Sequence, residues 1–247
     1  MKVTILFSLA FAFAIASEKT RCNALSMSTN AASKRVTVFG GTGFVGSAVC
    51  SRLVKKGYDV TALSRRGENP KPNDEWLSQV TWVKGDATNY ETVANAVAKS
   101  DAAVHAIGLL FDVNSGLENL NKIVSGSQSL PGADSTYDNI TRLTMFNLIK
   151  AISSKPRLPF VNNERFPLCF VSAAEAGWPD MAGGSLVEEK FAPDWLKRYL
   201  IAKRAVEDKL GDIETSKIIK SAIYRPSLIW DWTKVSGNVV YFFTFVC

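Results

Sequence analysis

Histidine is almost absent from this chain of 247 residues, since His105 is the only one. A Ser-His-Asp triad could therefore be built only on His105, and no second histidine is available for a paired metal site. The four cysteines include no pair at the Cys-x-x-Cys spacing of zinc sites and redox motifs. Neither a zinc site nor a disulfide framework is implied, and we expect no bound metal.

Long hydrophobic runs are also missing. The run from Ile5 to Ile15 is too short to span a bilayer as a permanent helix. With Lys2 before it and small residues after it, residues 1–17 are typical of a signal peptide. Residues 18–34 are rich in Ser, Thr, Asn and Ala and resemble a transit peptide. This bipartite leader predicts delivery to a plastid through the secretory route; the alternative is simple secretion or residence in the endoplasmic reticulum lumen.

Strong charge of one sign is lacking as well. The formal net charge is +6, and the basic residues are scattered, without aromatic residues interleaved among them. A nucleic-acid-binding surface normally gathers such residues into a patch, so nucleic acid is not an expected partner. The length and the hydrophobic content of 47% allow one globular domain with a sizeable core. We place this domain at residues 35–231 and a short tail at residues 232–247.

The most informative stretch is Arg35-Val-Thr-Val-Phe-Gly-Gly-Thr-Gly-Phe-Val-Gly46. It predicts a β-strand, a glycine turn and a helix to about Lys56, followed by a second strand from Tyr58 to Ser64. Glycines allow the backbone to turn sharply and to lie close to a pyrophosphate, which the helix N-terminus then binds. The pattern predicts a Rossmann fold, an α/β doubly wound parallel sheet. The alternative is a glycine-rich turn that binds nothing.

The residues after the second predicted strand indicate which dinucleotide is bound. An NAD site places an acidic residue there to accept from the ribose 2′-hydroxyl. This chain has Ser64-Arg65-Arg66 instead, and guanidinium groups bind a phosphate well. NADP(H) is therefore favoured over NAD(H). A solvated basic turn is the alternative.

The middle of the chain continues the alternation of strands and helices. Strands are predicted at Val80–Val83 and Ala102–Ile107, with a capping box at Thr88-x-x-Glu91 and a helix from Tyr137 to Ile152. His105 is interpreted as a satisfied, half-buried side chain. The connection from Leu109 to Asp134 is longer than such a connection needs, and predicts either a flap over an active site or a disordered segment.

The glycine spacing Gly40-Gly-Thr-Gly43-Phe-Val-Gly46 resembles that of the extended and atypical short-chain dehydrogenase/reductases. The likeness covers Arg35 to about Asp231, and the stretches from Tyr137 to Arg142 and from Tyr199 to Glu207 are similar to atypical members. Those members include the Rossmann accessory subunit of respiratory complex I and proteins connected with coenzyme Q or plastoquinone. The resemblance and the turn chemistry together predict a cofactor site made of Gly40, Thr42, Gly43, Phe44, Val45, Gly46, Ser64, Arg65, Arg66, Asp86, Ala106, Gly108 and Lys203.

The predicted catalytic residues are Ser172, Tyr199 and Lys203. Ser172 ends a strand predicted from Leu168, and the tyrosine and lysine share a helix face at i and i+4. An adjacent ammonium favours the phenolate form of a tyrosine, which makes it a better acid–base group. The resemblance implies that Ser172 and Tyr199 act on a substrate carbonyl and NADPH supplies hydride; a packed tyrosine beside a solvated lysine is the alternative. Where the family keeps a relay asparagine, this chain has Thr141.

The last predicted strand runs from Ser221 to Trp230 and contains Arg225-Pro226, as in extended and atypical relatives. The substrate-binding part after it is short or truncated, and a partner or a membrane surface could complete the pocket through the aromatic tail that includes Tyr241. Two functions remain open. One is NADPH-dependent reduction of a small carbonyl or quinone-like molecule, and the other is a non-catalytic nucleotide-binding scaffold of a membrane-associated quinone or electron-transfer assembly.

Overall fold

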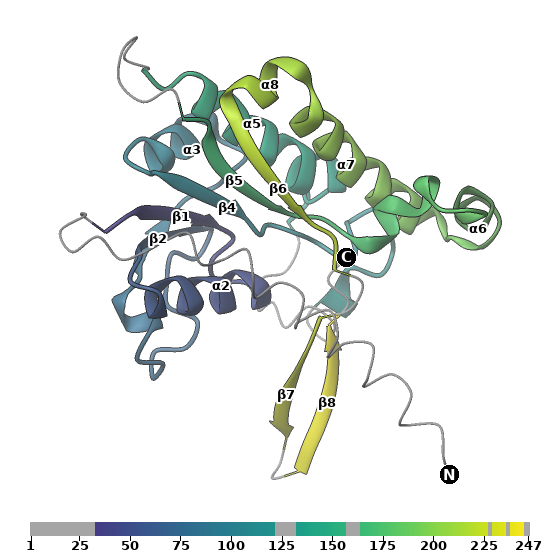
Figure 1. The fold of residues 1–247 in the computed structure, drawn as a ribbon. Coiled ribbons are helices and arrows are strands. Elements are labelled where there is room, and N and C mark those ends of the chain that lie inside the picture. The colour runs from purple at the N-terminus through teal and green to yellow at the C-terminus, as the bar shows by residue number, and fades with distance from the viewer. Residues whose placement is uncertain (1–32, 122–131, 157–163, 227–228, 236–237, 245–247) are drawn as a thin grey trace, which may run out of the picture. The chain divides into compact units, whose positions relative to one another are not determined.

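The computed structural model describes residues 33–121, 132–156, 164–226, 229–235 and 238–244 (Figure 1). The predicted signal peptide lies outside the described residues, as does the transit-like segment apart from Ser33 and Lys34. No helix within the described ranges is both long and apolar enough to cross a membrane.

Six parallel strands form the central sheet, in the order β3-β2-β1-β4-β5-β6. A dinucleotide-binding Rossmann fold has this strand order, and it confirms the predicted doubly wound sheet. The order reverses between β1 and β4, which pair directly with each other. Ligands of such sheets bind beyond the carboxyl ends of the strands at this reversal. The strands are β1 (Arg35–Phe39), β2 (Asp59–Ser64), β3 (Thr81–Lys84), β4 (Ala102–His105), β5 (Phe166–Val171) and β6 (Ile219–Tyr224).

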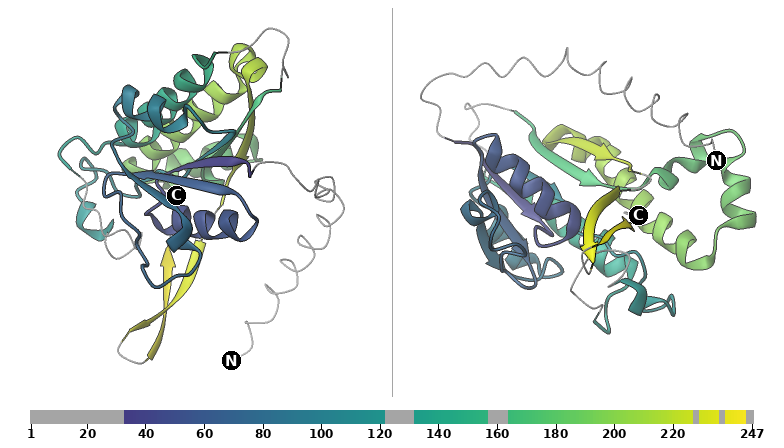
Figure 2. Two further views of the ribbon diagram at one scale, coloured as in Figure 1. Left: turned by 90° about the vertical axis from the view of Figure 1, so that its left-hand side faces the viewer. Right: turned by 90° about the horizontal axis from the view of Figure 1, so that it is seen from below.

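Helices cover the two faces of this sheet (Figure 2). Helix α2 (Phe44–Lys55) packs on one face, where Cys50 and Val54 meet Val38 of β1. The other face packs against three helices, α3 (Tyr90–Val97), α5 (Thr144–Ser153) and α7 (Asp194–Gly211). Because side chains alternate along a strand, Val38 and its neighbour Phe39 belong to opposite cores.

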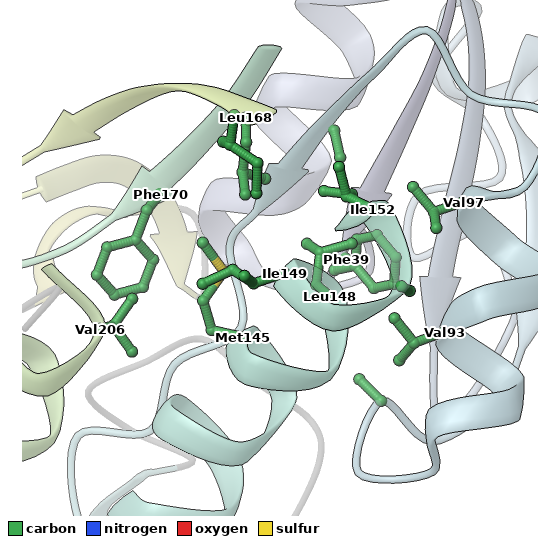
Figure 3. Close-up of a cluster of buried hydrophobic side chains, with 14 of the residues drawn as sticks. Phe39, Val93, Val97, Met145, Leu148, Ile149, Ile152, Leu168, Phe170 and Val206 are labelled. Carbon is green, nitrogen blue, oxygen red and sulfur yellow. The ribbon is translucent and has the colours of Figure 1, made fainter. Parts of the chain in front are cut away.

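The larger core lies between the sheet and these three helices (Figure 3). Met145 and Leu148 of α5 stand between the strand residues and the other helices, and both are fully buried. Phe170 of β5 contacts this core beside Val206 of α7. These contacts fix α7 against the carboxyl end of β5, which positions the candidate site.

Three local predictions differ from the structure. Asn89 rather than Thr88 caps α3, because the Thr88 hydroxyl donates to Asp86 while the Asn89 side chain accepts from the Thr92 N–H. Strand β6 ends at Tyr224, before Pro226, which has no N–H to donate. The strands β7 (Ile229–Val235) and β8 (Asn238–Thr244) pair instead in an antiparallel arrangement, which the sequence reasoning missed.

Candidate functional site

The glycine turn after β1 has the geometry that close approach of a ligand requires. Gly40 has a φ of 85°, in the left-handed region that favours glycine. A Cβ on Gly40 would lie 2.9 Å from the carbonyl carbon and oxygen of Ala106. A Cβ on Gly46 would lie even closer to the Gly40 oxygen, so this third glycine lets α2 pack against the turn. Both positions require glycine for steric reasons.

Helix α2 begins next to this turn without a side-chain cap. Its N-cap is Gly43, whose N–H donates to the Gly40 oxygen at 3.0 Å. No acidic residue lies in the first turn of the helix. The uncapped N–H groups and the positive end of the helix dipole are therefore suited to an anionic ligand such as a pyrophosphate.

A cleft opens at the carboxyl ends of β1, β2, β3 and β4. Eight of the predicted cofactor residues line it: Gly40, Thr42, Gly43, Ser64, Arg65, Asp86, Ala106 and Gly108. The predicted residues Phe44, Val45, Gly46, Arg66 and Lys203 do not line it. Sequence reasoning missed three polar lining residues, Asn121, Ser135 and Thr144, because they come from segments distant in sequence.

Two arginines lie where the cleft meets the end of β2. Arg65 lines the cleft and is exposed, whereas Arg66 donates to the Thr42 oxygen at 3.2 Å. The Ser64 hydroxyl accepts from the Gly67 N–H at 3.0 Å and shapes the turn that presents Arg65. Asp86 also lines the cleft, and its carboxylate accepts from the N–H and the hydroxyl of Thr88.

The predicted Ser/Tyr/Lys group lies between the end of β5 and α7. The Lys203 Nζ donates to the Val171 oxygen at 2.8 Å, immediately before Ser172. It also lies 5.4 Å from the centre of the Tyr199 ring and 4.9 Å from that of Phe170. The helix that carries Tyr199 and Lys203 thus meets the strand end at Ser172, although the catalytic role of the three residues stays a prediction.

Burial sets this group apart from the cleft. Ser172 and Tyr199 have no exposed surface, and Lys203 is 1% exposed. The interpretation of Lys203 as a solvated lysine is therefore wrong in this structure. Among the described residues the Ser172 hydroxyl has no hydrogen-bond partner, so it retains a donor for a ligand. A buried hydroxyl without a partner is unusual, and a catalytic role is one of its physical explanations.

A π-helical turn, η4 (Asp138–Leu143), precedes α5 where the sequence predicted a continuous α-helix. Such turns are frequent at functional sites. Thr141 lies in it, fully buried, and its hydroxyl has no partner among the described residues. Asn139 points elsewhere, since its amide donates to the Asp134 oxygen. Thr141, not Asn139, therefore occupies the inner face of this turn.

His105 at the end of β4 is fully buried, not half-buried as predicted. Its Nε2 lies 2.9 Å from the Thr144 hydroxyl, which itself donates to the Ile140 oxygen at 2.7 Å. The threonine must then accept from the imidazole, which assigns the ring proton to Nε2. Burial, helped by the charge of Lys203, lowers the pKa of His105 to about 3.

This burial predicts a measurable loss of stability in acid. Unfolded histidine takes up a proton below about pH 6.5 and folded His105 does not, so stability is full above pH 6.5 and falls as the pH drops towards 3. Between pH 7.5 and 5 the loss from this group is about 2 kcal/mol. Urea unfolding should show this loss of stability in the wild type and not in His105→Asn, because His105 is the only histidine. An identical pH dependence in both proteins would contradict the expectation.

An ion pair between a partly exposed arginine and a buried carboxylate is the main feature that sequence reasoning missed. Arg225, just after β6, donates from Nε to Glu207 of α7 at 3.1 and 3.2 Å. Its Nη1 also lies 3.7 Å from Asp180, in the short 3-10 segment η5 (Ala174–Asp180). The only signal in the sequence was the Arg225-Pro226 pair, which carries no indication of its partners. The arginine connects β6, α7 and the segment after Ser172.

Residues 36–128 match the family model of the NAD dependent epimerase/dehydratase family. An uncharacterized chloroplastic protein of Arabidopsis thaliana is 37% identical over 108 residues, which cover 43% of this chain and 33% of that protein. Component 2 of the MIOREX complex of Saccharomyces cerevisiae is 30% identical over 116 residues, covering 45% of this chain and 38% of that protein. This chain spans well under half the length of these two relatives.

Solved structures share the fold. A putative epimerase from Burkholderia cenocepacia is 26% identical with a TM-score of 0.52, and the match covers 78% of this chain and 54% of that one. The enzyme WbmF of Bordetella bronchiseptica, solved in complex with NAD+, is 18% identical with a TM-score of 0.52. The match covers 78% of this chain and 49% of that one. Strand order and glycine turn together identify a Rossmann fold of the dinucleotide-binding type, whose residues 36–128 are similar to the NAD dependent epimerase/dehydratase family.

Proposed function

We propose that this protein is an NADPH-dependent reductase of a small carbonyl or quinone-like molecule. The observation that carries the proposal is the meeting of Ser172, Tyr199 and Lys203 at the carboxyl end of β5, with Lys203 bound beside Ser172 and close to the Tyr199 ring. These residue types in this arrangement can donate to a carbonyl oxygen and transfer a proton to it.

The cleft fits the cofactor that this chemistry needs. The glycine turn leaves room for a pyrophosphate next to the N-terminus of α2, and a Cβ on Gly40 would remove part of that room. Arg65, exposed at the cleft, supports a preference for the 2′-phosphate of NADP(H) over the 2′-hydroxyl of NAD(H). When bound, the nicotinamide supplies hydride.

Each buried residue has a distinct part in the proposed reaction. The Ser172 hydroxyl, which has no partner among the described residues, donates to the substrate carbonyl oxygen. Tyr199 gives that oxygen a proton, and the ammonium of Lys203 stabilises the phenolate left behind. Low dielectric around these buried groups strengthens each of these interactions.

A non-catalytic scaffold is the second candidate, and one observation favours it. Tyr199 is fully buried, with its ring edge-on to that of Tyr137 at a centroid distance of 5.4 Å, as expected of a packing residue. In this role a bound nucleotide stabilises the fold by mass action. The assembly would be a membrane-associated quinone or electron-transfer complex, contacted through the C-terminal tail.

We also propose that the protein acts in a plastid. Two observations support this: the leader pattern of residues 1–34 and the chloroplastic relative of Arabidopsis thaliana. The alternative of secretion or residence in the endoplasmic reticulum lumen rests on the signal-peptide pattern alone.

Nucleotide titration followed by turnover tests this proposal. We expect the full chain to bind NADPH about tenfold more tightly than NADH, because one phosphate–arginine contact contributes roughly 1.5 kcal/mol. Tyr199→Phe should retain NADPH binding but lose at least about a hundredfold in the turnover of quinones or aldehydes. Tryptophan fluorescence measures binding, and NADPH absorbance measures turnover. Absence of NADPH binding would refute the reductase, and NADPH binding without turnover in the wild type would favour the scaffold.

A further inference from the structure

Tyr199 cannot be reached from the cofactor cleft in this structure, although the proposed function requires a substrate to touch it. The tyrosine has no exposed surface and does not line the cleft. Tyr137 covers its ring edge-on, and the Tyr137 hydroxyl donates to the Leu110 oxygen at 2.6 Å. The residues that follow β4 are therefore part of the cover over Tyr199.

Residues 109–114, which we call the strap, are held against the first half of α7. The Phe111 ring meets the Trp195 ring edge-on, with a centroid distance of 4.9 Å. Asp112 is 2% exposed and pairs with Arg198 at 3.3 Å, and the same guanidinium donates to the Asn114 oxygen at 3.1 Å. These contacts lie within one turn of Tyr199 on the helix, so the strap and the tyrosine are fixed together.

The strap also reaches the cofactor cleft. The Asn121 side chain closes the strap by accepting from the Phe111 N–H at 3.0 Å and donating to the Phe111 oxygen at 2.6 Å. Val113 donates to the Ser135 oxygen at 3.3 Å, and both Ser135 and Asn121 line the cleft. One short segment thus joins the cleft wall to the cover of the predicted catalytic tyrosine.

We propose that the strap is a latched cover over Tyr199, and that release of the Arg198–Asp112 latch admits a small carbonyl or quinone-like substrate to the tyrosine. Asp112 is the buried member of this ion pair. The Arg198 side chain is 41% exposed, so water can compete with Asp112 for its guanidinium. Such a pair is strong enough to hold the strap and weak enough to open. The substrate assignment rests on the proposed function; the cover itself rests on the contacts described above.

Nitration by tetranitromethane, located by peptide mass spectrometry, tests the latch without any substrate. Tyr199 should be protected in the full wild-type chain while Tyr224, which is 69% exposed, reacts as an internal reference. Arg198→Met should raise the rate at Tyr199 about fivefold relative to Tyr224, because it removes an interaction of roughly 1 kcal/mol. Phe111→Ala, which removes the contact with Trp195, should have the same effect.

Arg35→Met is the matched control, since the Arg35 side chain has a similar exposure of 49% and pairs with Asp101, away from the strap and from Tyr137. This variant should leave Tyr199 protected. Unchanged protection in both Arg198→Met and Phe111→Ala would overturn the latch, and so would equal nitration in Arg35→Met. Failure of NADPH binding or turnover would overturn the proposed reductase instead, because nitration reports on the cover alone.

Discussion

Gly40→Val is expected to weaken dinucleotide binding strongly. Gly40 has a φ of 85°, which a β-branched residue adopts only with strain, and its Cβ would lie 2.9 Å from backbone atoms of Ala106. The turn must then move out of the cleft wall that β1 and β4 form together. Because such strain costs about 1–3 kcal/mol, we expect NADPH binding to weaken by about 5- to 150-fold. Titration with NADPH, followed by tryptophan fluorescence, measures the change.

Gly57→Val provides the control for this substitution. Gly57 has a nearly identical φ of 82°, but a Cβ there meets no atom within 4 Å, and the residue does not line the cleft. It should lower stability through the same backbone strain and leave NADPH affinity unchanged. Wild-type affinity in Gly40→Val, with a cooperative thermal transition in both variants, would show that the glycine turn is not the phosphate site.

Loss of Arg225 is expected to have the largest effect on stability. The carboxylate of Glu207 is 7% exposed and receives the Arg225 guanidinium, so Arg225→Met leaves a buried charge without its partner. Breaking buried pairs costs about 3–5 kcal/mol, and we expect about 2–3 kcal/mol because Arg225 itself is 40% exposed. Urea unfolding measures the free energy of unfolding. NADPH affinity should be retained, since the cleft is built on β1 to β4.

The double variant Glu207→Met with Arg225→Met distinguishes the loss of the ion pair from the loss of side-chain packing. Removing both charges should recover most of the lost stability, since the penalty comes from the unpaired carboxylate. Lys217→Met serves as the control, because the Lys217–Glu214 pair is largely exposed at 62% and 77% and should change stability by less than about 0.5 kcal/mol. Equal stability of Arg225→Met and the wild type would show that the pair does not hold β6 to α7.

The same arginine explains how the segment after Ser172 is positioned. The Ser172 N–H donates to the Tyr224 oxygen at 2.6 Å, and the Ala174 N–H donates to the Pro226 oxygen at 2.9 Å. Arg225 lies between these two acceptors and reaches across to Glu207. The end of β6 therefore fixes the position of Ser172 relative to α7, which carries Tyr199 and Lys203.

Local sequence was enough to predict the glycine turn, the flanking strand and helix, and the doubly wound sheet. Glycine spacing and alternating apolar residues act over a few positions, so Gly40, Gly43 and Gly46 could be assigned to the turn without knowledge of the rest. The meeting of Tyr199 and Lys203 was predictable for the same reason, since i and i+4 share a helix face.

Only the tertiary structure showed which residues cover Tyr199 and which ion pairs hold the strands and helices together. The Arg198–Asp112 pair spans 86 residues and the His105–Thr144 contact spans 39, and neither has a local pattern that a sequence could display. Burial of Tyr199, the strap over it and the Arg225–Glu207 pair all depend on which distant segments pack together. Propensity and periodicity are short-range properties, whereas burial and ion pairing are set by the packing of the whole domain. For this reason the sequence determined the dinucleotide-binding fold, and only the structure showed that the site around Tyr199 is closed.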